Sequence, residues 1–187
     1  MIIIDAGHGG KDPGCTDGNI LEKDLALKIS LRQARLCEIY GIPYLLTRKE
    51  DKTTELHERT KLANKAINEH SGPTILISNH INSSPGLAKG FEIIRSHSDS
   101  TNYADRLLEL VRKSDILAVR KAFSRTNNSG KDYFHMIREA QCRSYIIEWG
   151  FIKNQKDMAS LNNNLTVACT LPIIAYIQDS IIQSNKK

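Results

Sequence analysis

Stretches typical of buried strands alternate along the chain with stretches that have the apolar spacing of helices, and this alternation constrains the fold most. Short apolar runs that suit strands occupy residues 1–5, 42–47, 74–78, 90–95 and 145–149. Helical patterns lie between or after these runs, over residues 21–40, 54–70, 103–117 and 166–183. We therefore predict an α/β fold with a mostly parallel sheet covered by helices on both faces.

The first and last helical patterns set the expected helix boundaries. Five residues of the first recur at intervals that place them on one face, namely Leu21, Leu25, Ile29, Leu36 and Tyr40. Gly41 follows as a stop signal, because many helices end at a glycine in the left-handed conformation. The last pattern, over residues 166–183, contains Pro172 near its expected start.

The composition fits one folded domain. The chain has 187 residues, of which 40% are hydrophobic and 25% charged, as in an ordinary soluble globular protein. A chain of this length buries a substantial core without disulfides, and its four cysteines show no Cys-x-x-Cys spacing. Cys37 and Cys169 lie in helical patterns and are interpreted as small core residues. We predict one domain over residues 1–183 and a short polar tail at 184–187.

Charge does not select a partner. The net charge is +5 and the sequence pI is about 9.0, but the basic residues are scattered. A mild excess of this kind favours polyanions in general, such as nucleic acid, teichoic acid or an anionic cell surface. Because aromatic and basic residues are not interleaved as in single-strand binders, we expect no nucleic-acid partner.

We recognise no export or membrane signal in the chain. Residues 1–5 form a short apolar run that ends in an acid, and they lack the basic start and cleavage site of a signal peptide. No apolar run has the length needed to span a membrane, so we expect no stable membrane insertion. A substrate outside the cytoplasm would then require release by another route, or the chain is an isolated catalytic domain.

Polar residues of an unusual kind stand at the ends of three predicted strands. His8 lies in a glycine-rich turn after the first strand, His80 follows the central strand, and Glu148 ends the late strand, while Glu22 begins the first long helix. Ligands of α/β proteins bind beyond the carboxyl ends of the strands. Two histidines and one carboxylate form a catalytic zinc set that leaves a position for water, and a further carboxylate can act as acid and base. His8, Glu22 and His80 are therefore candidate ligands, with Glu148 as candidate acid/base.

Each of these residues also has a simpler explanation when taken alone. His8 would be a structural turn histidine, Glu22 a first-turn acid favoured by the helix dipole, and His80 a hydrogen-bonded core histidine. Glu148 follows two isoleucines and precedes a tryptophan, and a carboxylate buried in this way usually has a partner or a function. The case for a metal site comes from the four residues together.

Other motifs are absent or weak. A dinucleotide-binding loop would need a third glycine where Asp12 stands, and there is no serine-hydrolase elbow. Cys15 is interpreted as a free thiol in a loop. The remaining histidines lack ligand spacing and are interpreted as surface or packing residues, and they are His57, His70, His97 and His135.

The sequence resembles the zinc-dependent N-acetylmuramoyl-L-alanine amidases of the amidase-3 type over nearly its whole length. The motifs that carry the resemblance are Ile4–Gly14 around His8, Glu22–Asp24, Leu46–Arg48 with Arg59 and Ala63–Asn64, Ser78–Asn82 around His80, and Glu148–Asn154. Two departures concern the surroundings of the site. Residues 119–123 lack a glycine that often follows an arginine in the family, and Trp149 replaces a smaller residue.

The resemblance implies Zn²⁺ held by His8, Glu22 and His80, Glu148 as general acid/base, and a mixed sheet of about six strands. It also implies hydrolysis of the amide between N-acetylmuramic acid and L-alanine of peptidoglycan, by a monomer at the bacterial cell wall, as an endolysin or an autolysin. The alternatives are a zinc peptidase or deacetylase acting on another wall bond, and a catalytically silent wall-binding module. Glu148 disfavours the silent module, since a pure binder needs no buried acid beside a metal.

Overall fold

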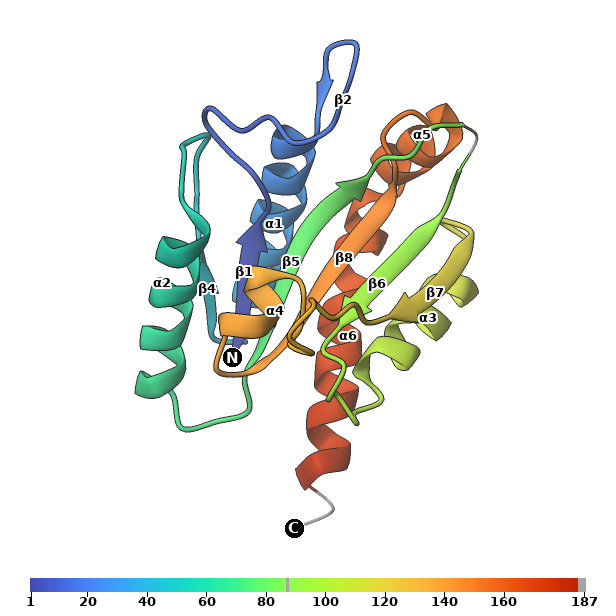
Figure 1. Cartoon of the computed structure of the whole chain (residues 1–187). Helices are drawn as coiled ribbons and strands as arrows, with labels where there is room; N and C mark the ends of the chain where they lie inside the picture. Colours follow the sequence, from blue (N-terminus) through green and yellow to red (C-terminus); the bar gives the residue numbers. More distant parts are fainter. Residues whose placement is uncertain (87, 185–187) are drawn as a thin grey trace.

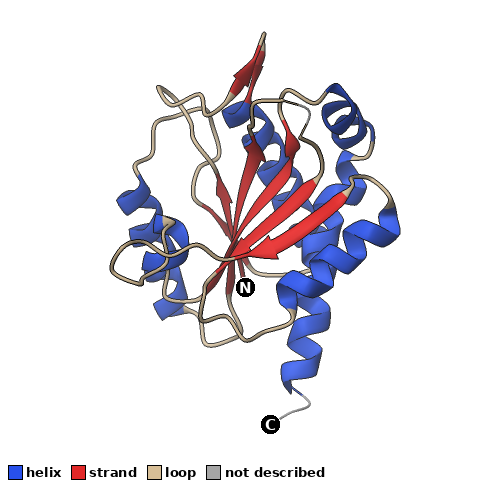
Figure 2. Cartoon of the chain, turned by 45° about the vertical axis from the view of Figure 1, so that its right-hand side comes forward, coloured by secondary structure: helices blue, strands red, loops and turns tan. Residues whose placement is uncertain are grey.

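A mixed, twisted sheet forms the centre of the computed structural model, which describes residues 1–86 and 88–184 (Figures 1 and 2). In spatial order the six strands found there are β4 (Tyr44–Leu46), β1 (Ile2–Ala6), β5 (Ile75–Asn82), β8 (Arg143–Phe151), β6 (Phe91–Arg95) and β7 (Val119–Phe123). Strands β4, β1, β5 and β8 are mutually parallel, whereas β6 runs antiparallel to β8 and parallel to β7. The predicted mostly parallel, mixed sheet is confirmed.

The strand directions bring the candidate site residues to one edge of the sheet. The carboxyl ends of β1, β5 and β8 lie at the same edge because these three strands are parallel neighbours. The amino ends of β6 and β7 reach that edge from the other side, since both strands run in the opposite direction. A small hairpin, β2 (Thr16–Asp17) and β3 (Ile20–Leu21), connects the loop after β1 to the first helix.

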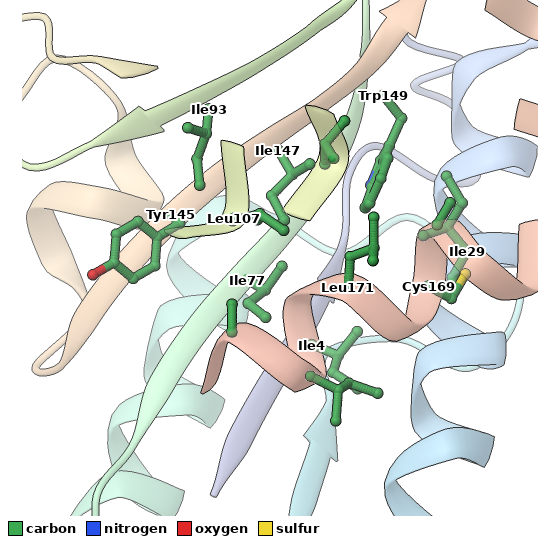
Figure 3. Packing of buried hydrophobic residues seen from close by; sticks show 14 of the residues in the cluster. Ile4, Ile29, Ile77, Ile93, Leu107, Tyr145, Ile147, Trp149, Cys169 and Leu171 are labelled. Atoms are coloured by element: carbon green, nitrogen blue, oxygen red, sulfur yellow. The ribbon is translucent and has the colours of Figure 1, made fainter. Parts of the chain in front are cut away.

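Three long helices cover one face of the sheet and form the main core with it. These are α1 (Glu22–Ile39), α3 (Tyr103–Ser114) and α6 (Leu165–Ser184), and α5 (Gln155–Asn163) adds Leu161. Figure 3 shows isoleucines of the central strands on the side of the sheet that faces these helices, and Ile77, Ile147 and Leu171 belong to one buried cluster. Continuous apolar strands are expected wherever a sheet is covered on both sides.

Two helices, α2 (Leu56–Glu69) and α4 (His135–Glu139), pack on the opposite face. Met136 of α4 belongs to the same buried cluster as Leu76 at the start of β5, and Ile137 belongs to the same cluster as Ile146 near the start of β8. Helix α4 therefore covers the amino-terminal halves of these strands. His80 and Glu148 lie an even number of positions after Leu76 and Ile146, so the carboxyl-terminal halves of the two strands carry them on this same face.

The structure extends and corrects the element boundaries that the sequence predicts. β5 continues through residues 79–82 and β8 starts at Arg143, so His80 and Glu148 lie within strands rather than at their ends. Tyr40 is 54% exposed, and the buried face of α1 instead includes the polar residues Ser30 and Gln33. Five of the described elements were not predicted, because they are short and most of them are rich in polar residues; they are β2, β3, β7, α4 and α5.

Helix α6 corrects two further expectations. Leu165–Ile182 is long and apolar enough to cross a membrane by length and composition alone, contrary to the sequence analysis. Its buried residues include Cys169 and Ile173, which pack in the main core, whereas Val167, Ile177 and Ile181 are exposed. Pro172 lies inside the helix rather than near its start. Ser184 ends the helix, and 185–187 of the expected tail lie outside the described residues.

A closed network of buried polar side chains ties α1 to the two central strands. The Asn79 side chain donates to Ser30 Oγ at 2.9 Å and to Gln33 Oε1 at 2.8 Å. Asn79 Oδ1 accepts a hydrogen bond of 2.9 Å from Trp149 Nε1. These four side chains are almost completely buried. Because Asn79 precedes His80 and Trp149 follows Glu148, the network fixes two candidate site residues relative to α1.

Replacing Asn79 with leucine is expected to lower the free energy of unfolding by roughly 1–3 kcal/mol or more, because it strands the buried groups of Trp149 and Gln33. Denaturant titration followed by circular dichroism measures the change. The same substitution at Asn162, an exposed residue of α5, is the control and is expected to change stability by less than about 0.5 kcal/mol. Equal effects at the two positions would contradict the role given to the network.

Candidate metal centre

The loop after β1 holds His8 in a conformation that is uncommon for a residue with a side chain. The backbone φ of His8 is 60°, in the left-handed region. The carbonyl oxygens of this loop are held by two arginines. Arg48 donates to Ala6 O at 2.9 Å and to Gly7 O at 2.8 Å, while Arg59 donates to the carbonyls of Ala6 and His8. This bonding explains how the strained loop persists, since such conformations need support from their surroundings.

Arg59 is itself fixed by a buried ion pair at the end of β1. Its Nη1 lies 3.0 Å from Asp5 Oδ1, and the two side chains are 3% and 1% exposed. Asp5 also accepts hydrogen bonds from Thr47 and Ser78. Burial alone would raise the pKa of Asp5, but the charge of Arg59 and these hydrogen bonds lower it below its ordinary value. The sequence offered Arg59 only as a family marker, and the structure shows what it supports.

Glu22, the first residue of α1, lies between the two candidate histidines. Its Oε1 is 3.1 Å from His8 Nε2 and 2.9 Å from His80 Nδ1. The backbone N–H of Ile81 donates to the same oxygen, and that of Cys15 donates to Oε2 at 2.8 Å. Burial opposes ionisation, but the hydrogen bonds and charges of the two histidines hold the pKa of Glu22 well below its usual range. Glu22 is therefore an ionised carboxylate placed between two imidazoles, and it remains a candidate ligand.

His8 and His80 meet over the end of the sheet because two glycines leave room for them. The two ring centroids lie 4.9 Å apart. A Cβ atom on Gly7 would come within 2.5 Å of the His80 ring, and one on Gly14 within 2.6 Å of the Glu22 carboxylate. Real Cβ atoms do not approach other atoms so closely, so both positions require glycine.

The donor atoms of these three side chains fit one metal ion. His8, Glu22 and His80 each offer one ligand atom, and the three atoms lie within 4.8 Å of one another. Imidazole nitrogens and a carboxylate oxygen are the donors that catalytic zinc sites use, with one position left for water. Burial lowers the pKa of His8, but the hydrogen bonds and charges of Glu22 and Asp12 outweigh it and raise the value to about 9. The predicted ligand residues are thus brought together.

Asp12 supports His8 from behind. Its Oδ2 lies 2.7 Å from His8 Nδ1, and its Oδ1 accepts the Gly14 N–H at 3.0 Å. A carboxylate on the second ring nitrogen orients a ligating histidine and leaves the other nitrogen free for a metal. Sequence reasoning missed this role, although Asp12 stands four positions after His8.

Replacing Asp12 with asparagine is expected to weaken zinc binding by roughly 10- to 100-fold, because the amide orients His8 less firmly. Competition with a chromogenic chelator measures the affinity. Asp17 to asparagine in the nearby hairpin is the control with the same loss of charge. An affinity unchanged by the Asp12 variant would show that the carboxylate does not support the ligand.

Glu148 lies beside this ligand set. It pairs with His80 in the β5–β8 register, and its strand neighbours Ile147 and Trp149 point into the main core on the opposite face. Its Oε2 is buried and has no hydrogen-bond partner among the described residues. Burial raises the pKa of Glu148 to about 7, with a further contribution from the charges of Glu22 and Glu92. A buried carboxyl without a partner has the character of an acid/base group.

Cys15 and two of the remaining histidines, His97 and His135, are bonded to neighbouring groups outside the ligand set. Cys15 donates its thiol proton to Ile81 O at 3.1 Å, and burial raises its pKa, so the thiolate is disfavoured. His97 pairs with Asp132, and His135 lies 3.2 Å from a threonine hydroxyl of α2. These observations agree with their interpretation as packing or surface residues.

The fold and site define a class of protein: α/β domains whose sheet edge presents two histidines and a carboxylate, with a further acid on the adjacent strand. The family model described as N-acetylmuramoyl-L-alanine amidase matches residues 2–170. The chain therefore belongs to the N-acetylmuramoyl-L-alanine amidase family.

Individual relatives agree with this assignment. The N-acetylmuramoyl-L-alanine amidase CwlM of Bacillus licheniformis is 32% identical over 168 residues, which cover 87% of this chain and 61% of the relative. Among solved structures, Cwp6 from Clostridium difficile matches with a TM-score of 0.86 and 31% identity, covering 96% of this chain and 29% of that one. The catalytic domain of the amidase CwlV from Bacillus (Paenibacillus) polymyxa var. colistinus matches with a TM-score of 0.79 and 26% identity, covering 95% and 98%.

The chain matches only part of the length of some relatives. The chain spans about three fifths of the length of CwlM, so the relative contains sequence with no counterpart here. The names of matched relatives include cell-wall amidases and an endolysin.

Proposed function

We propose that this chain hydrolyses the amide bond between N-acetylmuramic acid and L-alanine in peptidoglycan, with zinc as its metal. The observation that carries the proposal is the convergence of His8, Glu22 and His80 beside the unpaired carboxyl of Glu148. Membership in the amidase family supports the choice of bond. A zinc ion held by the three ligands would supply a Lewis acid and make water acidic enough to react near neutral pH.

Each residue has a distinct part in this reaction. His8, Glu22 and His80 would hold the metal, and Asp12 would fix the orientation of His8. Glu148 takes the proton of the attacking water and then delivers it to the leaving alanine nitrogen. Burial supports these two proton transfers because it raises the pKa of Glu148 toward neutrality, where a carboxyl can both accept and donate a proton.

Two alternatives use the same residues differently. A zinc peptidase or deacetylase acting on another wall bond would need the same ligand set and the same acid, so the family match favours the amidase. A silent wall-binding module would have no use for the unpaired Glu148 carboxyl. We further propose that the chain acts as a monomer at the bacterial cell wall, in lysis or remodelling, without nucleic-acid partner or membrane insertion.

The test is digestion of purified sacculi with zinc-loaded and chelator-treated protein, with mass spectrometry of the products. Stem peptides that start at L-alanine, released beside intact glycan strands and only with metal, are the expected result. Cleavage within the stem peptide would move the bond and support the peptidase. Wall binding without any cleavage would support the silent module.

A further inference from the structure

We propose a direction for the substrate on this site: the muramyl sugar occupies a cleft beside α2, and the stem peptide runs over β8 and β6 toward β7. The inference rests on the proposed amidase function and adds where the two halves of the substrate lie. Three features carry it: the shape and lining of the cleft, the charges along the opposite side, and the position of Glu148 between them.

The cleft opens directly beside the metal ligands. It has a volume of about 310 Å³ and is lined on one side by His8 and His80. The other side is formed by residues 53–55, by Leu56 at the start of α2, and by Met136 of α4. Leu56 is 52% exposed although it is apolar, so the wall of the cleft offers an apolar surface to a ligand.

The charges around the cleft suit a neutral sugar better than an acidic peptide. Glu55 lines the cleft and is exposed. The Asp12 carboxylate is already bonded to His8 and to the Gly14 N–H, and the positive charge of Arg59 is paired with buried Asp5. Exposed carboxylates repel the carboxylates of a stem peptide and can accept hydrogen bonds from sugar hydroxyls. An apolar wall with hydrogen-bond acceptors matches a pyranose ring that carries an acetamido group.

The other side of Glu148 has the opposite charge. Glu92 of β6 pairs with Glu148 in the strand register. Arg120 Nε lies 2.7 Å from Glu92 Oε1 and neutralises the Glu92 carboxylate. Beyond this pair, Lys121 on β7 and Lys89 in the loop before β6 are exposed. Because the Arg120 charge is used by Glu92, the two lysines leave this side positive, which favours the carboxylates of a stem peptide.

The chemistry of the leaving group fixes which half lies where. An acid that protonates the alanine nitrogen must lie on the peptide side of the scissile bond. In the sheet, β5 with His80 separates β1 from β8, so Glu148 and the cleft beside β1 lie on opposite sides of His80. The peptide therefore leaves over β8, and the lactyl group and its sugar point into the cleft.

The first test blocks the cleft with Leu56→Trp, at a position exposed enough to accept a larger side chain. Two substrates share the scissile amide: N-acetylmuramyl-L-alanyl-D-glutamate, and lactoyl-L-alanyl-D-glutamate, which lacks the sugar. We expect kcat/KM to fall at least about tenfold for the muramyl substrate and to stay within about twofold for the lactoyl one. If the lactoyl peptide turns over too slowly, its inhibition constant against the muramyl substrate replaces kcat/KM.

The second test reverses a charge on the peptide side. Lys121→Glu is expected to raise KM by about threefold to tenfold more for the D-glutamate substrate than for its D-isoglutamine counterpart, which lacks that carboxylate. The matched control is Lys65→Glu on the outer surface of α2, which makes the same change in net charge. This control is expected to affect the two substrates equally.

The outcomes separate this inference from the function on which it rests. If the wild-type protein cleaves neither sacculi nor the muramyl peptide, the proposed amidase function is itself contradicted. Wild-type cleavage with equal losses on both substrates in Leu56→Trp would place the peptide in the cleft and overturn the direction. Zinc content and thermal unfolding of each variant, equal to wild type, show that the losses come from the substrate contacts.

Discussion

Glu148→Gln is expected to lower kcat on muramyl peptides by roughly 10²- to 10⁴-fold while the zinc content stays at the wild-type level. The glutamine amide keeps the shape of the side chain but neither takes the proton of water nor gives one to the alanine nitrogen. Metal binding is spared because the three ligand atoms that converge come from other residues. Steady-state kinetics and elemental analysis of the same preparation measure the two quantities.

The control for this variant is Glu109→Gln, on the exposed surface of α3. It removes one carboxylate far from the sheet edge and is expected to leave both kcat and zinc content unchanged. A Glu148→Gln protein that keeps more than half of the wild-type kcat would show that Glu148 is not the acid/base of the reaction. A variant that loses zinc as well would indicate that Glu148 helps to hold the metal.

His80→Ala is expected to weaken zinc binding by more than the roughly 10- to 100-fold that follows from loss of a supporting hydrogen bond. The substitution removes one of the three donors and leaves Glu22 Oε1 with a single histidine neighbour. Isothermal titration or chelator competition gives the affinity, and the loss of activity should be restored in part by excess zinc.

His97→Ala provides the comparison for the histidine variant. His97 pairs with Asp132 and its side chain is 45% exposed, away from the ligand set. The zinc affinity and activity of the His97→Ala protein are expected to equal those of the wild type. Unchanged zinc affinity in the His80 variant would mean that His80 is a core histidine, and the metal would then need another ligand.

Much of the architecture could be predicted because its central strands are continuous apolar runs. Ile2–Ala6 and the first half of β5 read as buried strands from composition alone. The second half of β5 did not, because Asn79, His80 and Asn82 are polar. Their strand conformation depends on pairing with β8 and on the buried bonds of Asn79, which are long-range contacts.

The site divides in the same way. The four candidate residues were found because their types and positions match a hydrolytic zinc set, and the structure brings the three ligands together. The support for them was not predictable from spacing, since Arg48 and Arg59 reach the loop of His8 from more than forty positions away in the chain. Charges that distant elements bring to a site cannot be predicted from local spacing in the sequence.

The strand order has a consequence for the order of events during synthesis. β8 lies between β5 and β6. The edge of β5 that does not pair with β1 therefore has no partner strand until residues 143–151 have been made. The three ligand residues all precede position 81, whereas Glu148 arrives with the strand that completes the sheet. In the proposed mechanism, a chain that ends before residue 143 would contain all three candidate ligands but would lack the candidate acid. The proposed hydrolysis would therefore require the strand that joins the two halves of the sheet.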